Sequence, residues 1–518
     1  MFAVCKYIHH RHYMYAVETL DITNTFFIGN VYHVYGVDTR NIPCIQLHLH
    51  LHDRYYLYVE ETVDITSGLN ANLPTPCRVK IRTMKLDSPE FHSLFTAELL
   101  EVKRLFDKHQ YEIRIAGGAV RDLLMGVQPG DIDLATTATP DQMMDMFNEE
   151  NVRMLNKRGE KHGTVTCRIN DAENFEITTL RVDVVCDGRH ADVEFTTDWM
   201  LDANRRDLTV NAMFLGFDGT VFDYFGGLDD IEKRRVAFVG DAEKRIQEDY
   251  LRILRYFRFY GRVADAPDKH EESTLEAIRK NAKGLMGISG ERIWVELKKI
   301  VVGRYADSLL RLMLECGIGP YIGLGSDANI EEFCRVYFRC KDLKPEPMTL
   351  LSALLNSEDE VYRLDDRLKL SSNERVLSIF IVLHRDDAVM PREEEAKERY
   401  FKHLCFEPFM LKAEHTSKQR VCELLKYIGN GELSNELNQW VPPIFPVRGT
   451  MIVEEKYRKG PIMSIVLSKL FEKWRDSDFK LTVEELLDSM EDLPSPETLR
   501  LEYANSRKKL RRKRSHRR

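Results

Sequence analysis

The residues YEIRIAGGAVRD at 111–122, followed by GDID at 130–133, predict an alternation of strands and helices in the N-terminal half. The apolar run to Ala116 indicates a strand, two glycines permit a tight turn, and a helix follows. Glycines allow backbone N–H groups to approach a phosphate, and Arg121 can donate to two phosphate oxygens. Asp131 and Asp133 are two residues apart, so on a strand both would face one side. Two such carboxylates facing a triphosphate suit a pair of Mg²⁺ ions.

Each of these signals is weak alone, because a Gly-Gly pair can be a simple turn and two aspartates a solvated strand end. Their combination in a strand–turn–helix–loop–strand context favours a phosphate and metal site.

Outside this stretch, residues 111–230 alternate strand-like and helix-like patterns, whereas Asp241–Met490 is helical almost throughout. Thr139 with Gln142, and Thr482 with Glu485, form capping-box patterns that predict helix starts. We therefore predict an α+β head, with a mixed sheet and helices, followed by an all-α neck, body and tail. The predicted ranges are 1–83 for an unassigned extension, 84–235 for the head, 236–300 for the neck, 301–500 for the body and tail, and 501–518 for a basic end.

Length and composition limit the class of protein. The chain has 518 residues, 43% of them hydrophobic and 31% charged, with a formal net charge of −8, which is typical of a globular protein of two to four domains. No stretch of 18 or more apolar residues occurs, so no transmembrane helix and no membrane partner are expected. Ten cysteines without CxxC pairs indicate reduced thiols.

The two ends of the chain differ from the rest. Residues 1–83 hold the alternating run Leu47–His52, which on a strand would put three histidines on one face. Either a metal site or a biased extension fits this run. Met1–Val17 carries Lys6 and Arg11 and no acid, a faint transit-peptide signal. The basic run 507–518 fits either a nuclear-localisation or nucleic-acid patch, or a solvated end.

The motif set resembles the polymerase β nucleotidyltransferase superfamily, in the form of class II tRNA CCA-adding enzymes and bacterial poly(A) polymerases. It is most similar to the animal CCA-adding enzymes. The resemblance runs from about Met84 to the late helices. Beyond GGAVRD and GDIDLATTATP it rests on RGEKHG (158–163), FEITTLR (175–181), DGRH (187–190), RRDLTVNA (205–212), EDYLR (248–252) and SGERI (289–293).

The resemblance implies a role for each motif. The carboxylates would be catalytic, with Asp131 and Asp133 holding two Mg²⁺ ions and Glu176 either a third catalytic carboxylate or a surface residue. The remaining assignments are Gly117, Gly118, Arg121 and Asp122 for the triphosphate, Arg205, Arg206, Asp207 and Asn211 for the ribose, and Asp187, Gly188, Arg189 and His190 for a flexible loop. A helix-surface ion pair is the alternative for the ribose motif.

Base selection can be argued from the EDYLR motif itself. On a helix, Asp249 and Arg252 share a face, and Glu248 is one turn from Arg252. Cytosine and adenine each present an amino donor beside a ring-nitrogen acceptor, which a carboxylate and a guanidinium can pair with. Guanine and uracil reverse both roles and would leave buried polar groups unpaired. Arg255 and Arg258 follow at three-residue spacing and either reach phosphate or RNA or form a solvated basic face.

The function predicted from the resemblance is template-independent addition of CCA to the 3′ end of tRNA, with CTP and ATP as substrates. The alternatives are a poly(A) polymerase and a non-catalytic RNA-binding protein. Mitochondrial and cytoplasmic locations are expected, with a nuclear form open, since Met84 could be an internal start. Monomer and homodimer both remain open.

Overall fold

The computed structural model describes residues 8–10, 13–15, 25–27, 48–50, 57–64, 78–155, 163–186, 191–386, 390–391, 393–406, 415–452, 462–495, 497–499 and 501. The chain forms two compact units. The first comprises Met1–Glu296 with Leu312–Ile318, and the second comprises Leu297–Arg311 with Gly319–Arg518. Side chains of the three-histidine run and of the basic C-terminal end lie outside the described residues, so the predictions made for them stay predictions.

A nine-stranded sheet organises the first unit, in the order β5-β6-β15-β14-β7-β8-β11-β10-β9. Its strands are β5 (Leu57–Asp64), β6 (Arg78–Lys85), β7 (Ile113–Ala116), β8 (Asp133–Thr136), β9 (Arg153–Leu155), β10 (Thr164–Ile169), β11 (Glu173–Thr179), β14 (Phe214–Leu215) and β15 (Thr220–Asp223). Strands β8 and β11 pair in parallel and every other neighbouring pair is antiparallel, so the sheet is mixed, as predicted.

Short two-stranded pairs complete the β structure of this unit: β12 (Arg181–Cys186) with β13 (Ala191–Phe195), β1 (Ile8–His10) with β2 (Tyr13–Tyr15), and β3 (Thr25–Phe27) with β4 (His48–His50). Met84 belongs to β6, is buried, and pairs with Val221 of β15. The sheet therefore begins upstream of Met84.

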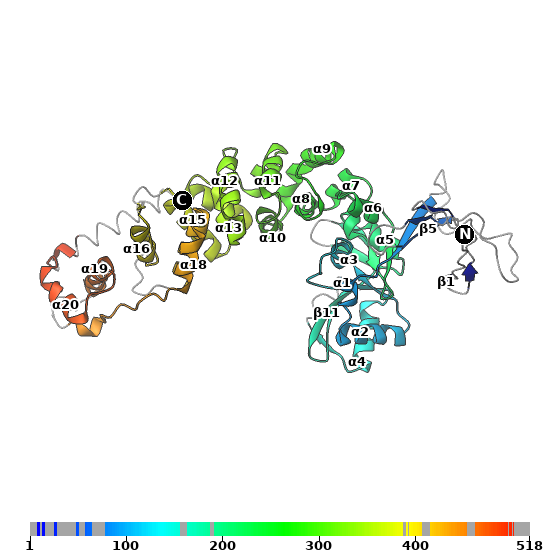
Figure 1. Ribbon diagram of the computed structural model, residues 1–518, viewed down its shortest axis with the longest axis horizontal. Coiled ribbons are helices and arrows are strands. Elements are labelled where there is room, and N and C mark those ends of the chain that lie inside the picture. The colour runs from blue at the N-terminus through cyan, green and yellow to red at the C-terminus, as the bar shows by residue number, and fades with distance from the viewer. Residues whose placement is uncertain are drawn as a thin grey trace, which may run out of the picture. The chain divides into compact units, whose positions relative to one another are not determined.

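The first unit also contains helices, some of which pack on this sheet. Those of the first unit are α1 (Pro89–His92), α2 (Ala97–Lys108), α3 (Gly118–Leu124), α4 (Pro140–Glu149), α5 (Trp199–Asn204), α6 (Gly227–Glu232), α7 (Ala242–Glu248), α8 (Arg252–Val263) and α9 (Glu272–Asn281), with 3₁₀ turns at Thr209–Asn211 and Ala282–Gly287. Helices α2 and α4, which lie close together in Figure 1, both contact β10. The predicted capping box at Thr139 and Gln142 opens α4, so this helix start is confirmed.

Two helices, α10 (Gly290–Val301) and α11 (Ala306–Glu315), each contribute residues to both units. The described residues of the second unit also form α12 (Ile330–Cys340), α13 (Pro347–Leu351), α14 (Glu358–Leu368), α15 (Ser372–His384), α16 (Glu394–Leu404), α17 (His415–Tyr427), α18 (Gly431–Gln439), α19 (Ile462–Asp476) and α20 (Val483–Asp488), with 3₁₀ turns at Gly319–Ile322, Lys341–Leu343, Ser352–Leu354, Gly449–Met451 and Ser489–Asp492. The predicted capping box of Thr482 and Glu485 opens α20. The all-helical character of the C-terminal part is confirmed.

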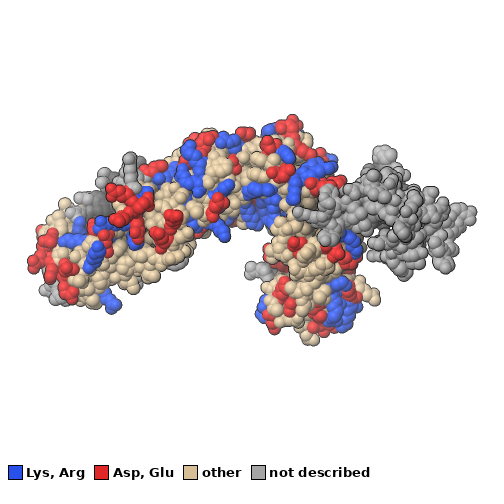
Figure 2. Space-filling view, in the orientation of Figure 1, with Lys and Arg blue, Asp and Glu red and all other residues tan. Residues whose placement is uncertain are grey.

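The surface is polar and mixed in sign. Basic and acidic side chains are interspersed on the face of the described residues that Figure 2 shows. None of the helices in the described ranges has both the length and the apolar character that a bilayer crossing needs.

Candidate nucleotidyltransferase site

A cleft of about 840 Å³ lies in the first unit. It is lined by residues of α3, β8, β12, α5, α8 and the start of α10, and the charged side chains among its described lining residues are aspartates and arginines. The arginines are Arg121, Arg181, Arg205, Arg206, Arg252, Arg255, Arg258, Arg262 and Arg292. The aspartates are Asp122, Asp131, Asp133, Asp183, Asp202, Asp207 and Asp249. Because one guanidinium group can donate hydrogen bonds to two phosphate oxygens, this lining suits a nucleotide.

The glycine turn forms one wall of the cleft. Gly117 has φ +63° and precedes α3, a conformation that L side chains rarely adopt. A Cβ at this position would lie 2.9 Å from Nη1 of Arg206. Glycine here therefore allows the turn and the close approach of that arginine at once, and Gly118 beside it also lines the cleft.

Arg121 is held in place by neighbouring side chains. Its side chain is only 3% exposed, and burial lowers its pKa. Nε and Nη2 donate to Oδ1 of Asp122 at 3.0 and 2.9 Å, and Nη1 donates to Oδ1 of Asn211 at 2.5 Å. Asp122 also accepts from Nη2 of Arg262 at 2.6 Å. Asp122 thus positions arginines from α3 and α8, and the triphosphate contact expected of it stays a prediction.

The predicted carboxylates lie together, with one difference from expectation. Strand β8 begins at Asp133, so Asp131 lies in the loop before the strand and not on it. Glu176 of β11 is the parallel-register partner of Asp133. Partners in adjacent strands project to the same face, so Glu176 stands beside Asp133.

The environment of Asp133 fits a cation. Partial burial raises the pKa of its carboxyl, Arg206 counteracts this, and the charge of Asp131 raises the pKa further. A divalent ion between the two carboxylates would relieve their repulsion, and carboxylate oxygens are the ligands that Mg²⁺ prefers. Elsewhere in the described part of the chain, His109, Glu149 and Glu150 offer ligand atoms within 4.8 Å of one another. Glu150 there already accepts from Lys108 and His109.

The two arginines of the RRD motif share a partner that the sequence analysis did not identify. Asp202 of α5 is only 1% exposed. Its Oδ1 accepts from Nε and Nη2 of Arg205 at 2.8 and 2.5 Å, and its Oδ2 accepts from Nε and Nη2 of Arg206 at 3.2 and 3.1 Å. Asp202 precedes these arginines by three and four residues, a helical spacing that could have revealed it.

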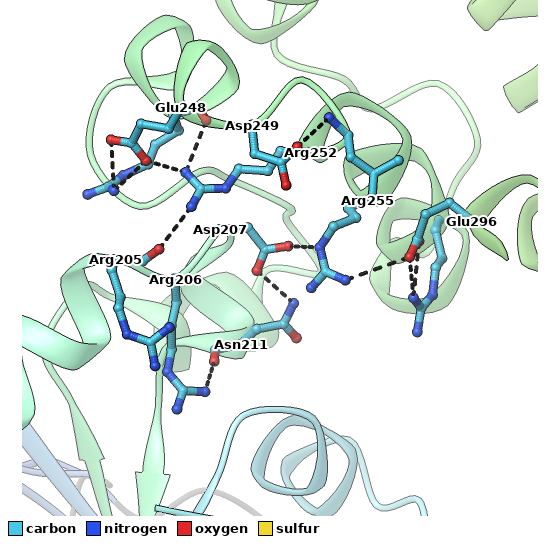
Figure 3. A network of polar contacts seen from close by, with 12 residues as sticks. Arg205, Arg206, Asp207, Asn211, Glu248, Asp249, Arg252, Arg255 and Glu296 are labelled. Carbon is cyan, nitrogen blue, oxygen red and sulfur yellow. Dashed lines mark hydrogen bonds and ion pairs between the residues drawn. The ribbon is translucent and has the colours of Figure 1, made fainter. Parts of the chain in front are cut away.

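The third residue of that motif has a distant partner. Asp207 accepts from Nε of Arg255 at 2.6 Å through Oδ2, and from Nδ2 of Asn211 at 3.4 Å through Oδ1 (Figure 3). Burial would raise the pKa of Asp207, but Arg255 lowers it overall. The alternative given from the sequence, a helix-surface ion pair, does not describe Asp207, because this residue is buried.

The EDYLR motif does not lie on one continuous helix, and this expectation was wrong. Helix α7 ends at Glu248 and α8 begins at Arg252, with an extended backbone at Asp249 (φ −152°). Oδ1 of Asp249 accepts the N–H of Leu251 at 3.1 Å. This local bond competes with helix continuation, which is the usual behaviour of aspartate at helix ends.

The junction still gathers the predicted side chains. Glu248 pairs with Arg252, whose Nη2 also donates to the backbone oxygen of Arg205 at 3.0 Å (Figure 3). Asp249 is held from a third helix, because Nη2 of Arg292 donates to its Oδ2 at 2.7 Å. Arg292 also lines the cleft.

Arg255 and Arg258 face the cleft around one aromatic ring. Their guanidinium carbons lie 5.2 and 4.7 Å from the centre of the Phe259 ring. Buried Glu296 accepts from Nη1 of Arg258 at 3.1 Å and lies 3.8 Å from Nη1 of Arg255. Of the remaining predicted residues, the loop Asp187–His190 lies outside the described residues.

Family models match two segments of the chain. The poly(A) polymerase head domain matches residues 113–237, and a probable RNA and SrmB-binding site of polymerase A matches residues 269–323. The mixed sheet, the glycine turn and the carboxylates of an arginine-rich cleft thus define a nucleotidyltransferase.

Similarity over most of the chain shows which nucleotidyltransferase family it belongs to. The chain is 53% identical to the mouse mitochondrial CCA tRNA nucleotidyltransferase 1 over 405 residues, which are 78% of this chain and 92% of the mouse protein. It is 51% identical to the zebrafish protein of that name over 419 residues, 81% and 96% of the two chains. The chain belongs to the family of CCA tRNA nucleotidyltransferases, and it is therefore an enzyme.

Solved structures agree with this family. The CCA-adding enzyme of Bacillus stearothermophilus in complex with CTP superposes with a TM-score of 0.59 at 26% identity, covering 82% of this chain and all of that one. The Thermotoga maritima CCA-adding enzyme complexed with tRNA, at 18% identity and a TM-score of 0.52 over 78% and 98% of the two chains, has the same fold.

Proposed function

We propose that this enzyme completes tRNA by adding C, C and A to its 3′ end, using CTP twice and ATP once without a nucleic-acid template. One observation carries the proposal most directly. Asp249 and Arg252, the candidate base readers, line the same cleft as the candidate catalytic carboxylates Asp131 and Asp133. The names of the animal relatives and the CTP-bound relative support the same activity.

Base choice would follow from the donor and acceptor pattern at the helix junction. The carboxylate of Asp249 accepts from the amino group of cytosine or adenine, and the guanidinium of Arg252 donates to the neighbouring ring nitrogen. Glu248 and the backbone oxygen of Arg205 hold that guanidinium, so it is oriented in advance. Guanine and uracil would leave both groups unpaired, which costs more than the bonds themselves contribute.

The rest of the nucleotide would occupy the other walls of the cleft. The phosphates approach Gly117 and Gly118 and the guanidinium of Arg121, whereas Arg205, Arg206, Asp207 and Asn211 surround the ribose. A 2′-hydroxyl is both donor and acceptor, and this set offers both kinds of partner.

Asp131 and Asp133 are proposed to hold two Mg²⁺ ions. When bound, such a pair promotes ionisation of the attacking hydroxyl and stabilises the leaving pyrophosphate. Glu176, beside Asp133, is proposed as the third carboxylate, which accepts the proton of the primer 3′-hydroxyl. The loop Asp187–His190 is proposed to change the pocket between C and A addition, and the helical C-terminal part to hold tRNA by shape.

The direct test is incorporation of labelled CTP and ATP into tRNA that lacks its last three nucleotides. We expect two cytidines and then one adenosine. Asp131→Ala should abolish addition while tRNA binding survives, and the exposed-site control Asp145→Ala should leave both unchanged. Full activity of Asp131→Ala would refute the assignment of this carboxylate.

A poly(A) polymerase is the competing activity, because the matching head model is named for that enzyme. The same assay separates the two. Extension with ATP alone, with CTP ignored, would refute CCA addition.

We propose a mitochondrial location, because the named relatives are mitochondrial enzymes. A second form starting at Met84 would supply a cytoplasmic or nuclear pool. Such a form would lose most of β6, so mass spectrometry of native N-termini should be paired with a stability measurement of the shortened chain.

A further inference from the structure

A second cavity, of about 640 Å³, adjoins the nucleotide cleft. It is enclosed by the segment between α1 and α2, the loop before β8, and strands β10 and β11. Three residues line both spaces: Gly130, Asp131 and Asp133. The candidate catalytic carboxylates therefore form a shared wall between the two spaces.

The two spaces differ sharply in charge. Among the described residues, the cleft is lined by nine arginines, whereas the second cavity is lined by neither arginine nor lysine. It has four carboxylates instead, those of Asp131, Asp133, Glu173 and Glu176. A triphosphate would be repelled here, because phosphate recognition relies on cations. A neutral ligand rich in hydroxyl groups suits this space.

The geometry of nucleotidyl transfer indicates which ligand the second cavity would bind. In nucleotidyl transfer the attacking oxygen and the leaving oxygen lie roughly in line through the reacting phosphorus. A bond forms between the primer 3′-oxygen and the α-phosphorus, the bond to the pyrophosphate oxygen breaks, and the hydroxyl proton passes to a carboxylate. If pyrophosphate leaves into the arginine-lined cleft, the hydroxyl must enter from the opposite side of the shared wall. Glu176 lines the second cavity and not the cleft, so it stands on the hydroxyl side.

We propose that the second cavity binds the last nucleoside of the RNA acceptor strand and presents its 3′-hydroxyl to Asp133 and Glu176. This inference rests on the proposed function, and it adds the place of the second substrate. Gln128 and Asn174 are its positioning residues.

Two amides support this assignment. Oε1 of Gln128 accepts from Oγ of Ser93 at 3.1 Å, and Oδ1 of Asn174 accepts from Nη1 of Arg168 at 2.8 Å. Because each amide oxygen already accepts a hydrogen bond, the NH₂ groups of Gln128 and Asn174 remain as donors for a ligand. Purine N3 and pyrimidine O2 are acceptors at the same edge of every base that could end the strand. Donors aimed at this edge would tolerate the changing last base, as the growing end requires.

Steady-state kinetics of CTP addition to end-trimmed tRNA test the proposal. Loss of one neutral hydrogen bond typically weakens binding about fivefold. We therefore expect Gln128→Ala and Asn174→Ala each to raise the KM for tRNA about fivefold and to leave the KM for CTP unchanged. Asn148→Ala, at an exposed position of α4 outside both spaces, is the matched control. Melting temperatures of all variants identify any that fail to fold.

A trimmed tRNA with an abasic last nucleotide sharpens the result. The unaltered enzyme should have a higher KM for this abasic tRNA. The further increase in KM caused by Asn174→Ala or Gln128→Ala should be smaller with it than with ordinary trimmed tRNA. A raised KM for CTP with unchanged KM for tRNA would overturn the proposal, as would two folded variants with unaltered kinetics. If the unaltered enzyme adds no cytidine at all, it is the proposed function that fails.

Discussion

The exchange Asp202→Asn tests the electrostatic frame of the cleft. Asp202 is almost wholly buried and accepts four hydrogen bonds from Arg205 and Arg206. Burial would raise the pKa of its carboxyl, but the charges of Arg206 and Arg205 lower it overall. The ion pairs of Asp202 with Arg205 and Arg206 thus stabilise the fold at pH values above the ordinary pKa of aspartate. This contribution is lost as the pH falls through the lowered pKa of Asp202. At pH 7 the full effect of the exchange should be seen.

The magnitude follows from burial. Removing one partner of a buried ion pair costs about 3–5 kcal/mol. For a domain of this size that corresponds to about 6–20 °C in melting temperature. Function should suffer as well, because the backbone oxygen of Arg205 holds Arg252 and Nη1 of Arg206 donates to the backbone oxygen of Asn211. We expect a drop in kcat/KM for CTP of at least tenfold at a temperature where the variant is folded.

Calorimetry and CTP incorporation, measured on one preparation, provide the assay. Asp145→Asn, on the exposed side of α4, is the control, and it should change the melting temperature by less than about 2 °C. An Asp202→Asn variant that has the melting temperature and the KM for CTP of the unaltered enzyme would refute the view that this carboxylate holds the arginines in place.

Three further predictions concern other parts of the first unit. Gly117→Ala should lower the free energy of unfolding by more than about 1 kcal/mol in a denaturant titration, because φ is positive and the new Cβ would lie 2.9 Å from Nη1 of Arg206. Arg292→Ala should release Asp249 and raise misincorporation of GTP and UTP relative to CTP by about tenfold, which competition assays with mixed nucleotides would detect. Burial lowers the pKa of His270, so the native state favours its neutral form and should lose stability as the pH falls from 7 to 5. His270→Phe should flatten that dependence of melting temperature on pH, and an equal slope in both proteins would contradict it.

Local signals in the sequence predicted local structure well. The capping box at Thr139 opens α4, and the strand before Gly117 ends at Ala116, as expected. Each depends on neighbours a few residues away, which the sequence shows directly. The helix expected through Glu248–Arg252 failed for a local reason as well, because Asp249 bonds the N–H of Leu251 and favours a helix end.

Tertiary partners were harder to foresee. Arg292 is 43 residues from Asp249, and Glu296 is 38 from Arg258, so no spacing rule connects either pair. Asp202 is different, since its helical spacing to Arg205 was visible. It was overlooked because exposed pairs at that spacing contribute little, and only burial gives this one its importance.

The pairing of arginine with aspartate in the cleft has a consequence for ionic strength. Among the described lining residues, nine arginines and seven aspartates leave a formal excess of two positive charges. A groove of unpaired cations would attract any polyanion and release many counterions on binding, so its affinity would fall steeply with salt. Here most of the positive charge is already compensated from within. Nucleotide affinity should therefore respond only mildly to salt, and stray nucleic acid should gain little by entering. We therefore expect high affinity only for a ligand whose own acceptors can replace those carboxylates as partners of the arginines.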